Sequence, residues 1–318
     1  MLRFIASRFM TSIFSVLGAT IMIFILVQFH NDPRELFVPD SGWGMTQQQW
    51  DNLGVRLGLD KPLVIQYFEW LGRTLRGDLG ISLARQMAVV DLLKGKIGAT
   101  VQLAVGGWLF AVLLGIPLGV VAAVKRGSFW DYVARLMALV GQAAPPFVTG
   151  LLLIWVFSVW IEWFPSGGRS PEFDWKDYVL PCIALGWGAA AGLMRLTRSS
   201  MLEVLDSEYI RLARAKGVDW NWVIYKHALR NALIAPVTSM FIMFASWLNG
   251  ALVIEIVFSW PGIGYDALFL AVNDNDFPLL LGTVFVFILI YLVFAAVADI
   301  AYTLIDPRVR LGSASEDS

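Results

Sequence analysis

Long apolar runs separated by shorter polar segments dominate the pattern of this chain. Six such runs cover about residues 9–29, 99–124, 133–160, 178–196, 234–258 and 278–304. An α-helix needs about 20 mostly apolar residues to cross the hydrocarbon core of a bilayer. A helix also satisfies its own backbone polar groups there. The pattern therefore predicts an all-α, polytopic membrane protein with about six transmembrane helices.

The first run also has features of a signal peptide. The apolar core of a signal peptide is only about 7–15 residues long and leads into a small-residue cleavage site. The run 9–29 is longer, and the sequence HNDPRE follows it. We therefore expect a retained first helix and a single transmembrane domain over residues 1–318.

Two of the runs predict how their helices pack. The run 178–196 is rich in Gly and Ala, and small residues let helix backbones approach closely. We expect this helix inside the bundle. In the run 133–160, Pro145 and Pro146 are adjacent. Pro146 lacks a backbone donor and disfavours α geometry at Pro145, so we expect a kink or break in the helix there. The two prolines are therefore candidates for a gate or for the lining of a transport path.

The segment 30–98 is the one long polar connection, and we expect it outside the membrane. The pattern of residues 45–75 predicts short amphipathic helices at the outer surface. Trp50, Tyr67, Phe68 and Trp70 would suit the headgroup level, where Trp and Tyr are enriched.

The charges of the short loops predict an orientation. Basic residues gather before the first run, after the second, after the fourth and after the sixth: Arg3, Arg8, Lys125, Arg126, Arg195, Arg198, Arg211, Arg214, Lys216, Lys226, Arg230, Arg308 and Arg310. The segment between the fifth and sixth runs carries only acidic charges, on Asp266, Asp274 and Asp276. Basic loops stay in the cytoplasm. We expect both termini, including the tail 305–318, to be cytoplasmic.

Composition agrees with the membrane prediction and narrows the chemistry. Charged residues make up 15% of the chain, against about a quarter in soluble domains. The 24 basic and 25 acidic residues nearly balance, so no nucleic-acid partner is indicated. Cys182 is the only cysteine and the two histidines, His30 and His227, are far apart. We therefore expect no metal site.

Enzyme motifs are missing from the sequence. It contains no GxxxxGK[ST], HExxH or GxSxG pattern, so we expect no catalytic residue, no ATP hydrolysis and no cofactor bound by this chain. Ionisable residues are sparse in the apolar runs, and Glu255 and Asp299 are the main candidates. Intramembrane acids are often functional. For Asp299 a structural role near a helix end is favoured, and for Glu255 structural and gate-lining roles are both open.

The segment 199–233, between the fourth and fifth runs, predicts a short helix of its own. Asp206 or Ser207 is placed to cap it, and Leu205, Tyr209, Leu212 and Ala213 recur at helical spacing as one apolar stripe. Gly217 is placed to end the helix in a left-handed turn. Asp219 can cap a second helix. A docking site for a partner and a helix on the membrane surface are both open interpretations.

The same residues resemble a known family. ARAKG, followed by HALRNALIAP, resembles the cytoplasmic EAA loop of ABC transporter permeases of the dipeptide, oligopeptide and nickel importer family. LGLDKPLVIQYFEWLGRTLRGDLGISL, FSWPGIGYDAL and IDPRVR add to the resemblance in the order typical of that family's first permease. It implies a type I ABC importer permease fold with a cytoplasmic coupling helix. The residues implied in ATPase coupling are Glu208, Tyr209, Arg211, Leu212, Ala213, Arg214, Ala215, Lys216 and Gly217.

The resemblance also implies a location in a bacterial or archaeal plasma (inner) membrane, and it implies partners. These are a second homologous permease, two cytoplasmic ABC ATPases that bind ATP and Mg, an extracytoplasmic solute-binding protein, and membrane lipid. The chain would form the translocation path for peptides or similar small solutes. Nickel complexes, glutathione or oligosaccharides are alternative cargoes of the same machinery. An ion-driven secondary transporter is the alternative from a different class, and it would need paired intramembrane charges.

Overall fold

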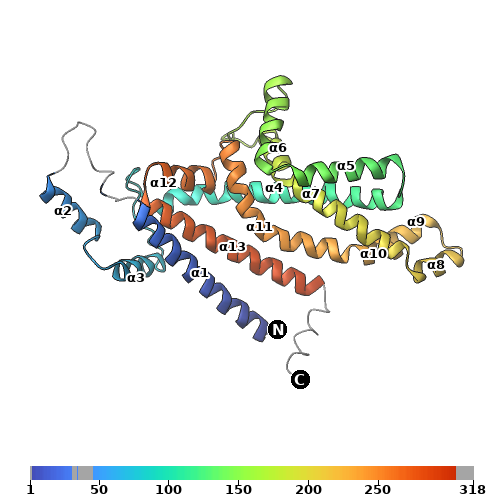
Figure 1. Ribbon diagram of the computed structural model, residues 1–318, viewed down its shortest axis with the longest axis horizontal. Helices are drawn as coiled ribbons and strands as arrows, with labels where there is room; N and C mark the ends of the chain where they lie inside the picture. The colour runs from blue at the N-terminus through green and yellow to red at the C-terminus, as the bar shows by residue number, and fades with distance from the viewer. Residues whose placement is uncertain (1, 31–33, 35–45, 306–318) are drawn as a thin grey trace. The chain divides into compact units, whose positions relative to one another are not determined.

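A computed structural model describes residues 2–30, 34 and 46–305, and most of those residues are helical (Figure 1). Within the described residues the only β-type pairing is an isolated bridge between Ile81 and Ala88. The helices, of which η2, η3 and η4 are π-helical, are α1 Leu2–His30, α2 Gln47–Leu57, α3 Leu63–Thr74, α4 Val89–Val124, α5 Phe129–Ala143, α6 Pro146–Leu153, η2 Ile154–Trp160, α7 Trp175–Leu205, α8 Glu208–Ala215, α9 Trp220–Trp222, η3 Val223–Ala228, α10 Leu229–Ala232, α11 Ile234–Val257, η4 Ile263–Phe269, α12 Leu270–Asn273 and α13 Phe277–Ile305.

Each predicted apolar run falls on helical structure. Judged on the described residues alone, the stretches Val89–Val124, Trp175–Leu205 and Phe277–Ala298 are each long and apolar enough to span a bilayer. The bent pair Phe129–Ala143 and Pro146–Trp160 makes a fourth span if it counts as one. Helices α1 and α11 cover the remaining two runs, but part of their side chains lies outside the described residues. The total of six spans therefore stays a prediction.

The break predicted at the two prolines is confirmed. Helix α5 ends at Ala143, Ala144 is extended, and α6 begins at Pro146. The two helical segments on either side are bent by 109°. Proline at the first helical position suits the start of α6, because the missing backbone donor has no partner there in any helix.

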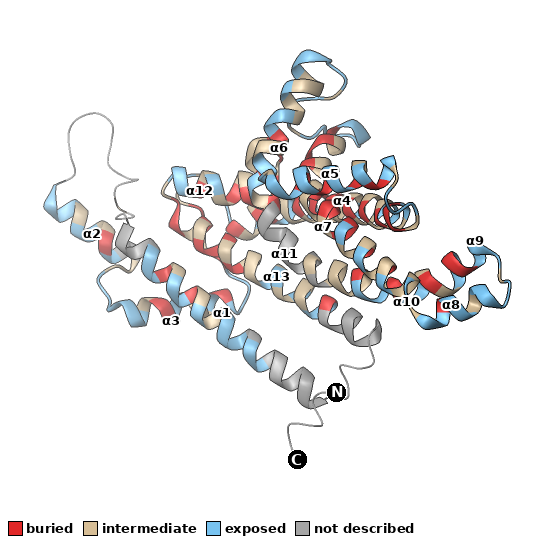
Figure 2. Cartoon of the chain, turned by 45° about the vertical axis from the view of Figure 1, so that its right-hand side comes forward, coloured by how far each residue is buried: buried red, intermediate tan, exposed pale blue. Residues whose placement is uncertain are grey.

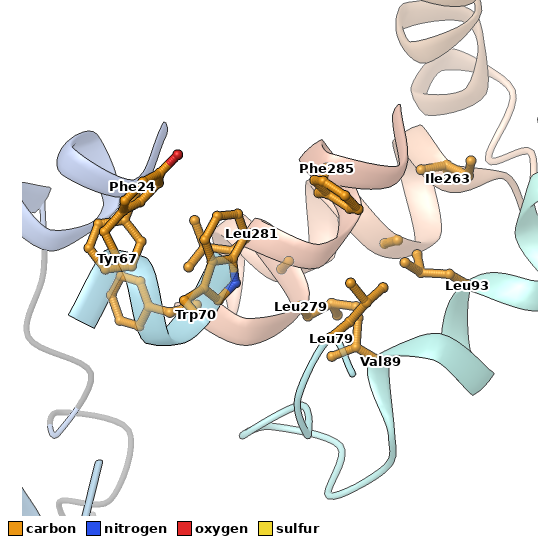
Figure 3. Packing of buried hydrophobic residues seen from close by; sticks show 13 residues of the cluster. Phe24, Tyr67, Trp70, Leu79, Val89, Leu93, Ile263, Leu279, Leu281 and Phe285 are labelled. Atoms are coloured by element: carbon orange, nitrogen blue, oxygen red, sulfur yellow. The ribbon is translucent and has the colours of Figure 1, made fainter. Parts of the chain in front are cut away.

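The chain packs as two compact units. One, the N-terminal unit, comprises Met1–Ala99 and Pro261–Leu292, and the other, the central unit, comprises Thr100–Trp260 and Val293–Ser318. The core of the N-terminal unit combines aliphatic and aromatic side chains, and its aromatic part joins α1, α3 and α13 (Figure 3). Tyr67 packs edge-on against Phe24 at 5.5 Å, and Trp70 packs edge-on against Phe285 at 6.4 Å between ring centroids.

Two residues predicted for the headgroup level are therefore core residues. The amphipathic helices α2 and α3 form as predicted, but Tyr67 and Trp70 are only 8% and 7% exposed. Their spacing of three residues puts both on one face of α3, and that face packs inside the unit. The Tyr67 hydroxyl also lies 3.0 Å from Thr20 Oγ1. Phe68, on the other face, is exposed.

In the central unit, α7 packs against α5, α6 and α11. This confirms that the Gly- and Ala-rich run lies inside the bundle, and buried residues follow α7 over most of its length (Figure 2). Helix α4 approaches α7 so closely that a Cβ on Gly115 would lie 2.6 Å from the Ala190 carbonyl oxygen. A Cβ on Gly119 would lie equally close, 2.6 Å, to the Met194 carbonyl oxygen. Only glycine fits at these two positions.

We predict that Gly119→Ala lowers the free energy of unfolding by about 1–3 kcal/mol, the usual cost of overpacking a close-packed interior. The measurement is the midpoint of unfolding in detergent. The matched control is Gly192→Ala in α7, where the new Cβ meets only the Gln142 side chain at an ordinary 3.6 Å. Both changes remove a helix-interior glycine, so equal effects of the two variants would contradict the close-approach argument.

Candidate functional site

The segment that joins α7 to α11 folds into a short helix, α8, as the sequence predicts. Ser207 stands at the N-cap with extended backbone, but its hydroxyl donates to the Val204 carbonyl and makes no cap bond. The predicted position of the cap is right and the predicted cap bond by Ser207 is wrong. Gly217 follows the helix with φ of +77°, which confirms the left-handed turn. The Asp219 carboxylate accepts from the Asn221 amide and caps α9, as predicted.

One side chain anchors α8 to the rest of the central unit. Ile210 is 1% exposed and belongs to a cluster formed by Ala123, Met201, Ile210, Val223, Ile224, Ala228 and Ala232. The predicted apolar stripe is only partly right, because Tyr209 and Leu212 are 43% and 57% exposed. Leu205 and Ala213 do pack against the cluster. The buried face of so short a helix is narrow, and Ile210 occupies it.

The remaining surface of α8 is open and mixed in chemistry (Figure 2). The exposed residues of the helix and its end are Glu208, Tyr209, Arg211, Leu212, Arg214, Ala215, Lys216 and Gly217. Arg211 donates to Glu208 at 2.8 Å, one turn earlier on the same helix. The Arg214 guanidinium lies over the Trp220 ring, 5.0 Å from its centroid. The structure thus brings the predicted coupling residues together on one exposed element.

A polar contact fixes the orientation of α8 relative to the chain that follows it. The Tyr209 hydroxyl accepts from Asn231 Nδ2 at 3.1 Å, and Asn231 also donates to the His227 carbonyl. Tyr209 therefore connects α8 to η3 and α10, while Ile210 connects it to the end of α7 through the shared cluster.

The residues predicted for the gate or path lie in three different helical regions, the start of α6, α11 and α13. Glu255 in α11 is completely buried, and its Oε1 accepts from the Thr100 hydroxyl at 2.6 Å. Pro145 and Pro146 stand at the start of α6, which packs against α11. The side chain of Asp299 lies outside the described residues. Within the described residues no group of three or more His, Cys, Asp or Glu side chains could hold a metal ion.

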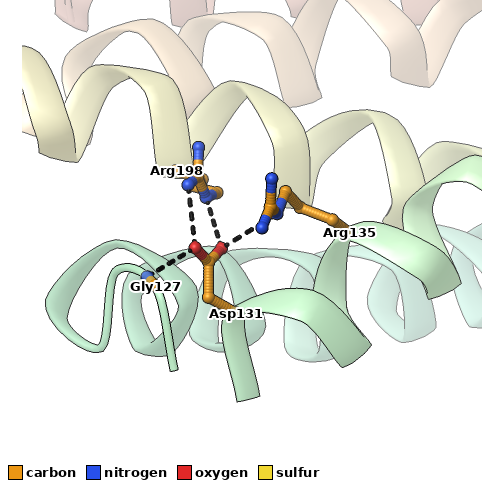
Figure 4. A network of polar contacts seen from close by, with 4 residues as sticks. All are labelled: Gly127, Asp131, Arg135 and Arg198. Atoms are coloured by element: carbon orange, nitrogen blue, oxygen red, sulfur yellow. Dashed lines mark hydrogen bonds and ion pairs between the residues drawn. The ribbon is translucent and has the colours of Figure 1, made fainter. Parts of the chain in front are cut away.

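Sequence reasoning missed a buried ion pair between α5 and α7 (Figure 4). Asp131, at 1% exposure of its side chain, accepts from Arg198 Nε at 2.8 Å and Nη2 at 3.0 Å. It also accepts from the Gly127 amide, and Arg135 lies 3.5 Å away. The only sequence signal here is that Asp131 is an acid in the first turn of a helix. That signal gives no indication of a partner 67 residues later in the sequence.

A second missed carboxylate organises the N-terminal unit. Asp276 is completely buried and accepts from the Ser82 hydroxyl and from the amides of Leu83 and Leu279. The bond from Leu279 caps the first turn of α13, and the other two hold the loop that precedes α4. An Asp directly before a long apolar run is a recognisable cap signal. No local sequence signal indicates its bonds to a loop 193 residues away in the sequence.

Comparison with known proteins adds independent findings. Residues 115–311 match the sequence family described as the binding-protein-dependent transport system inner membrane component, and residues 1–104 match its N-terminal region. A protein of Brucella suis biovar 1, provisionally named a peptide permease, is 40% identical over 98% of this chain and 100% of its own. The glutathione transport system permease protein GsiC of Escherichia coli O6:H1 is 35% identical over 98% and 99%.

A solved structure supports the fold. A chain from the inward-facing MetNI methionine ABC transporter matches 68% of this chain and 96% of its own length, with a TM-score of 0.56 and 17% identity. At that identity the match concerns the fold alone, and the fold is that of a type I ABC importer permease.

The family match, the named relatives and the apolar helices show a multi-pass inner-membrane permease, a transport subunit rather than a catalytic one. The chain belongs to the family of binding-protein-dependent transport system inner membrane components, and it is a permease subunit of an ABC importer. The resemblance drawn from the EAA-like motif is thereby confirmed. As a member of this family the chain works with other components of an ABC transporter.

We predict that Asp276→Ala loosens the loop around Leu83 and the start of α13, at a cost of about 1–3 kcal/mol for the donors left unpaired. Hydrogen exchange of the Leu83 and Leu279 amides is the measurement, and both should exchange faster. Asp274→Ala is the control, because Asp274 is exposed two residues earlier. Unchanged exchange in Asp276→Ala would show that the carboxylate is not what holds the loop.

Proposed function

We propose that this permease subunit pairs with a second, homologous permease and that α8 docks on one of two cytoplasmic ABC ATPases. The observation that carries the proposal is the state of α8: one fully buried anchor, Ile210, with Ala213 packed beside it, and exposed residues over the rest of the helix between two spans. ATP and Mg bind to the ATPases, and this chain binds no cofactor. The absence of a GxxxxGK[ST] pattern supports that division of labour.

The coupling follows from how α8 is attached. Closure of the ATPases moves α8, and the two attachments through Ile210 and Tyr209 pass the displacement to α7 and α10. A ligand shifts a conformational equilibrium only by its different affinity for the two states. Docking of α8 on closed ATPases therefore favours the permease conformation in which α8 has moved, which we identify with the outward-facing state.

The cargo we propose is a peptide or a similar small solute, delivered by an extracytoplasmic solute-binding protein. The provisional peptide permease of Brucella suis and the glutathione permease of Escherichia coli both support this class. The path runs along the interface between the two permeases. Pro145, Pro146, Glu255 and Asp299 are candidates for it, and Glu255, with its buried bond to Thr100, fits a structural role best.

Both termini are cytoplasmic in this proposal, which puts α8 on the ATPase side. The support is the distribution of basic residues. Arg198, Arg211 and Arg230 all belong to the end of α7 and the connection to α11. The acidic Asp266 and Asp274, between α11 and α13, belong to the outer side.

We predict that Leu212→Glu abolishes co-purification of the ATPase with the permease while the permease itself folds normally. Leu212 is exposed on α8, so a charge costs little in the free subunit but must be desolvated when the ATPase covers it. Phe173→Glu is the control, an apolar residue in the loop before α7 that is 81% exposed, against 57% for Leu212. Retention of the ATPase by Leu212→Glu would refute docking through α8.

We further predict that Gly217→Val uncouples transport from ATP hydrolysis. A β-branched residue strains the φ of +77° at the end of α8, so the helix end shifts relative to its anchor. Uptake into proteoliposomes and stimulation of the ATPase by the binding protein are the measurements. Gly217→Asn is the control, because Asn tolerates the left-handed region. If Val and Asn behave alike, the turn has no role in coupling.

A further inference from the structure

A groove between α5 and α7 combines an apolar wall with an excess of positive charge. Its volume is about 330 Å³, within the range of small-ligand sites. The wall is formed by Ala134, Ala138, Leu139 and Met194, and three guanidiniums, those of Arg135, Arg195 and Arg198, line one part of it. These belong to two helices of the same compact unit, so the groove is a feature of its internal packing.

The charges in the groove are not balanced. Asp131 engages Arg198 through both carboxylate oxygens, so Arg198 is neutralised by a buried partner. Arg135 lies farther from that carboxylate, at 3.5 Å, and its side chain is 48% exposed (Figure 4). Arg195 is exposed. Three arginines line the groove, and among the residues that the structure describes the Asp131 carboxylate pairs with Arg198 and Arg135 only. The groove therefore favours an anion that can accept hydrogen bonds from Arg135 and Arg195.

The neighbouring surface of α5 shows what kind of molecule meets the groove. The first turn exposes Trp130 and Tyr132, residue types enriched where the bilayer meets water. The Arg135 guanidinium lies over the Tyr132 ring at 4.4 Å from its centroid. The next turns expose Leu136, Leu139 and Val140. The first turn of α5 therefore carries the residue types found at the level of lipid headgroups, and the next turns carry the apolar residues found at the level of acyl chains.

We propose that this groove is a binding site for an anionic phospholipid. The headgroup phosphate accepts hydrogen bonds from Arg135 and Arg195, and an acyl chain lies along Ala138 and Leu139. Arg198 does not bind the lipid directly, because its donors are directed to Asp131; it positions α5 against α7 so that the groove exists. Basic pockets between membrane helices are known sites for acidic headgroups. The proposal does not depend on the substrate or on the docking role of α8.

Native mass spectrometry of the permease in detergent tests the site, with dioleoyl phosphatidylglycerol and dioleoyl phosphatidylcholine as probes. We expect retention of phosphatidylglycerol well above phosphatidylcholine. Each of Arg135→Gln and Arg195→Gln should weaken it about 5-fold and the double variant about 30-fold, from the usual contribution of one basic residue near an anionic surface. Arg198 and Asp131 stay intact in all of these variants, so the α5–α7 pairing is preserved, and an unchanged unfolding midpoint verifies it.

The matched control is Arg230→Gln, which removes one exposed positive charge on α10, outside the groove. It should leave retention unchanged, and an equal loss in this control would reduce the effect to general surface attraction and overturn the proposal. Equal binding of the two lipids, or unchanged binding in the double variant, would also overturn it. Glycerol phosphate at the same concentration separates the two possible sources of phosphate: we expect no competition, and full competition would assign the groove to a free anion.

Discussion

The close approach of α4 and α7 is the contact on which the central unit depends. Between helices in a bilayer there is no hydrophobic driving force, so packing has to supply the attraction. At Gly115 and Gly119 the two backbones are so near that a methyl group would overlap a carbonyl oxygen of α7. With α7 held there, α5, α6 and α11 pack around it. The direction in which α7 leaves this contact then decides where α8 lies.

Buried carboxylates hold the connections that helix packing leaves loose. Asp131 joins the start of α5 to α7, and Asp276 joins the start of α13 to the loop before α4. Both stand in or next to the first turn of a helix, where the dipole and the free amides favour a negative charge. Both are fully hydrogen-bonded in place, which offsets the high cost of burying a charge. Each of them fixes the start of a helix to a segment far away in the sequence.

Helix α8 differs from these elements in the way it is held. It is retained by Ile210, by Ala213 beside it and by the Tyr209 hydroxyl, and most of its residues are exposed. A helix of that length is unstable by itself in water, so its order depends on those attachments. The same attachments hold α8 in a fixed position after the end of α7. The proposed docking of α8 on a partner ATPase depends on these attachments, and it is consistent with the family to which the chain belongs.

The sequence by itself determined the class of protein, the helical runs, the break at Pro145 and Pro146, and the position of α8 between its caps. These properties are local: hydropathy over about 20 residues, proline geometry, and the preferences of Gly217 and Asp219 at helix ends. Only the tertiary structure decided which side chains are buried. Ile210 rather than Tyr209 faces inward on α8, Tyr67 and Trp70 lie in a core, and Arg198 meets Asp131. Helical spacing places residues on a common face, but which face is covered depends on partners far away in the chain, and no local pattern contains that information.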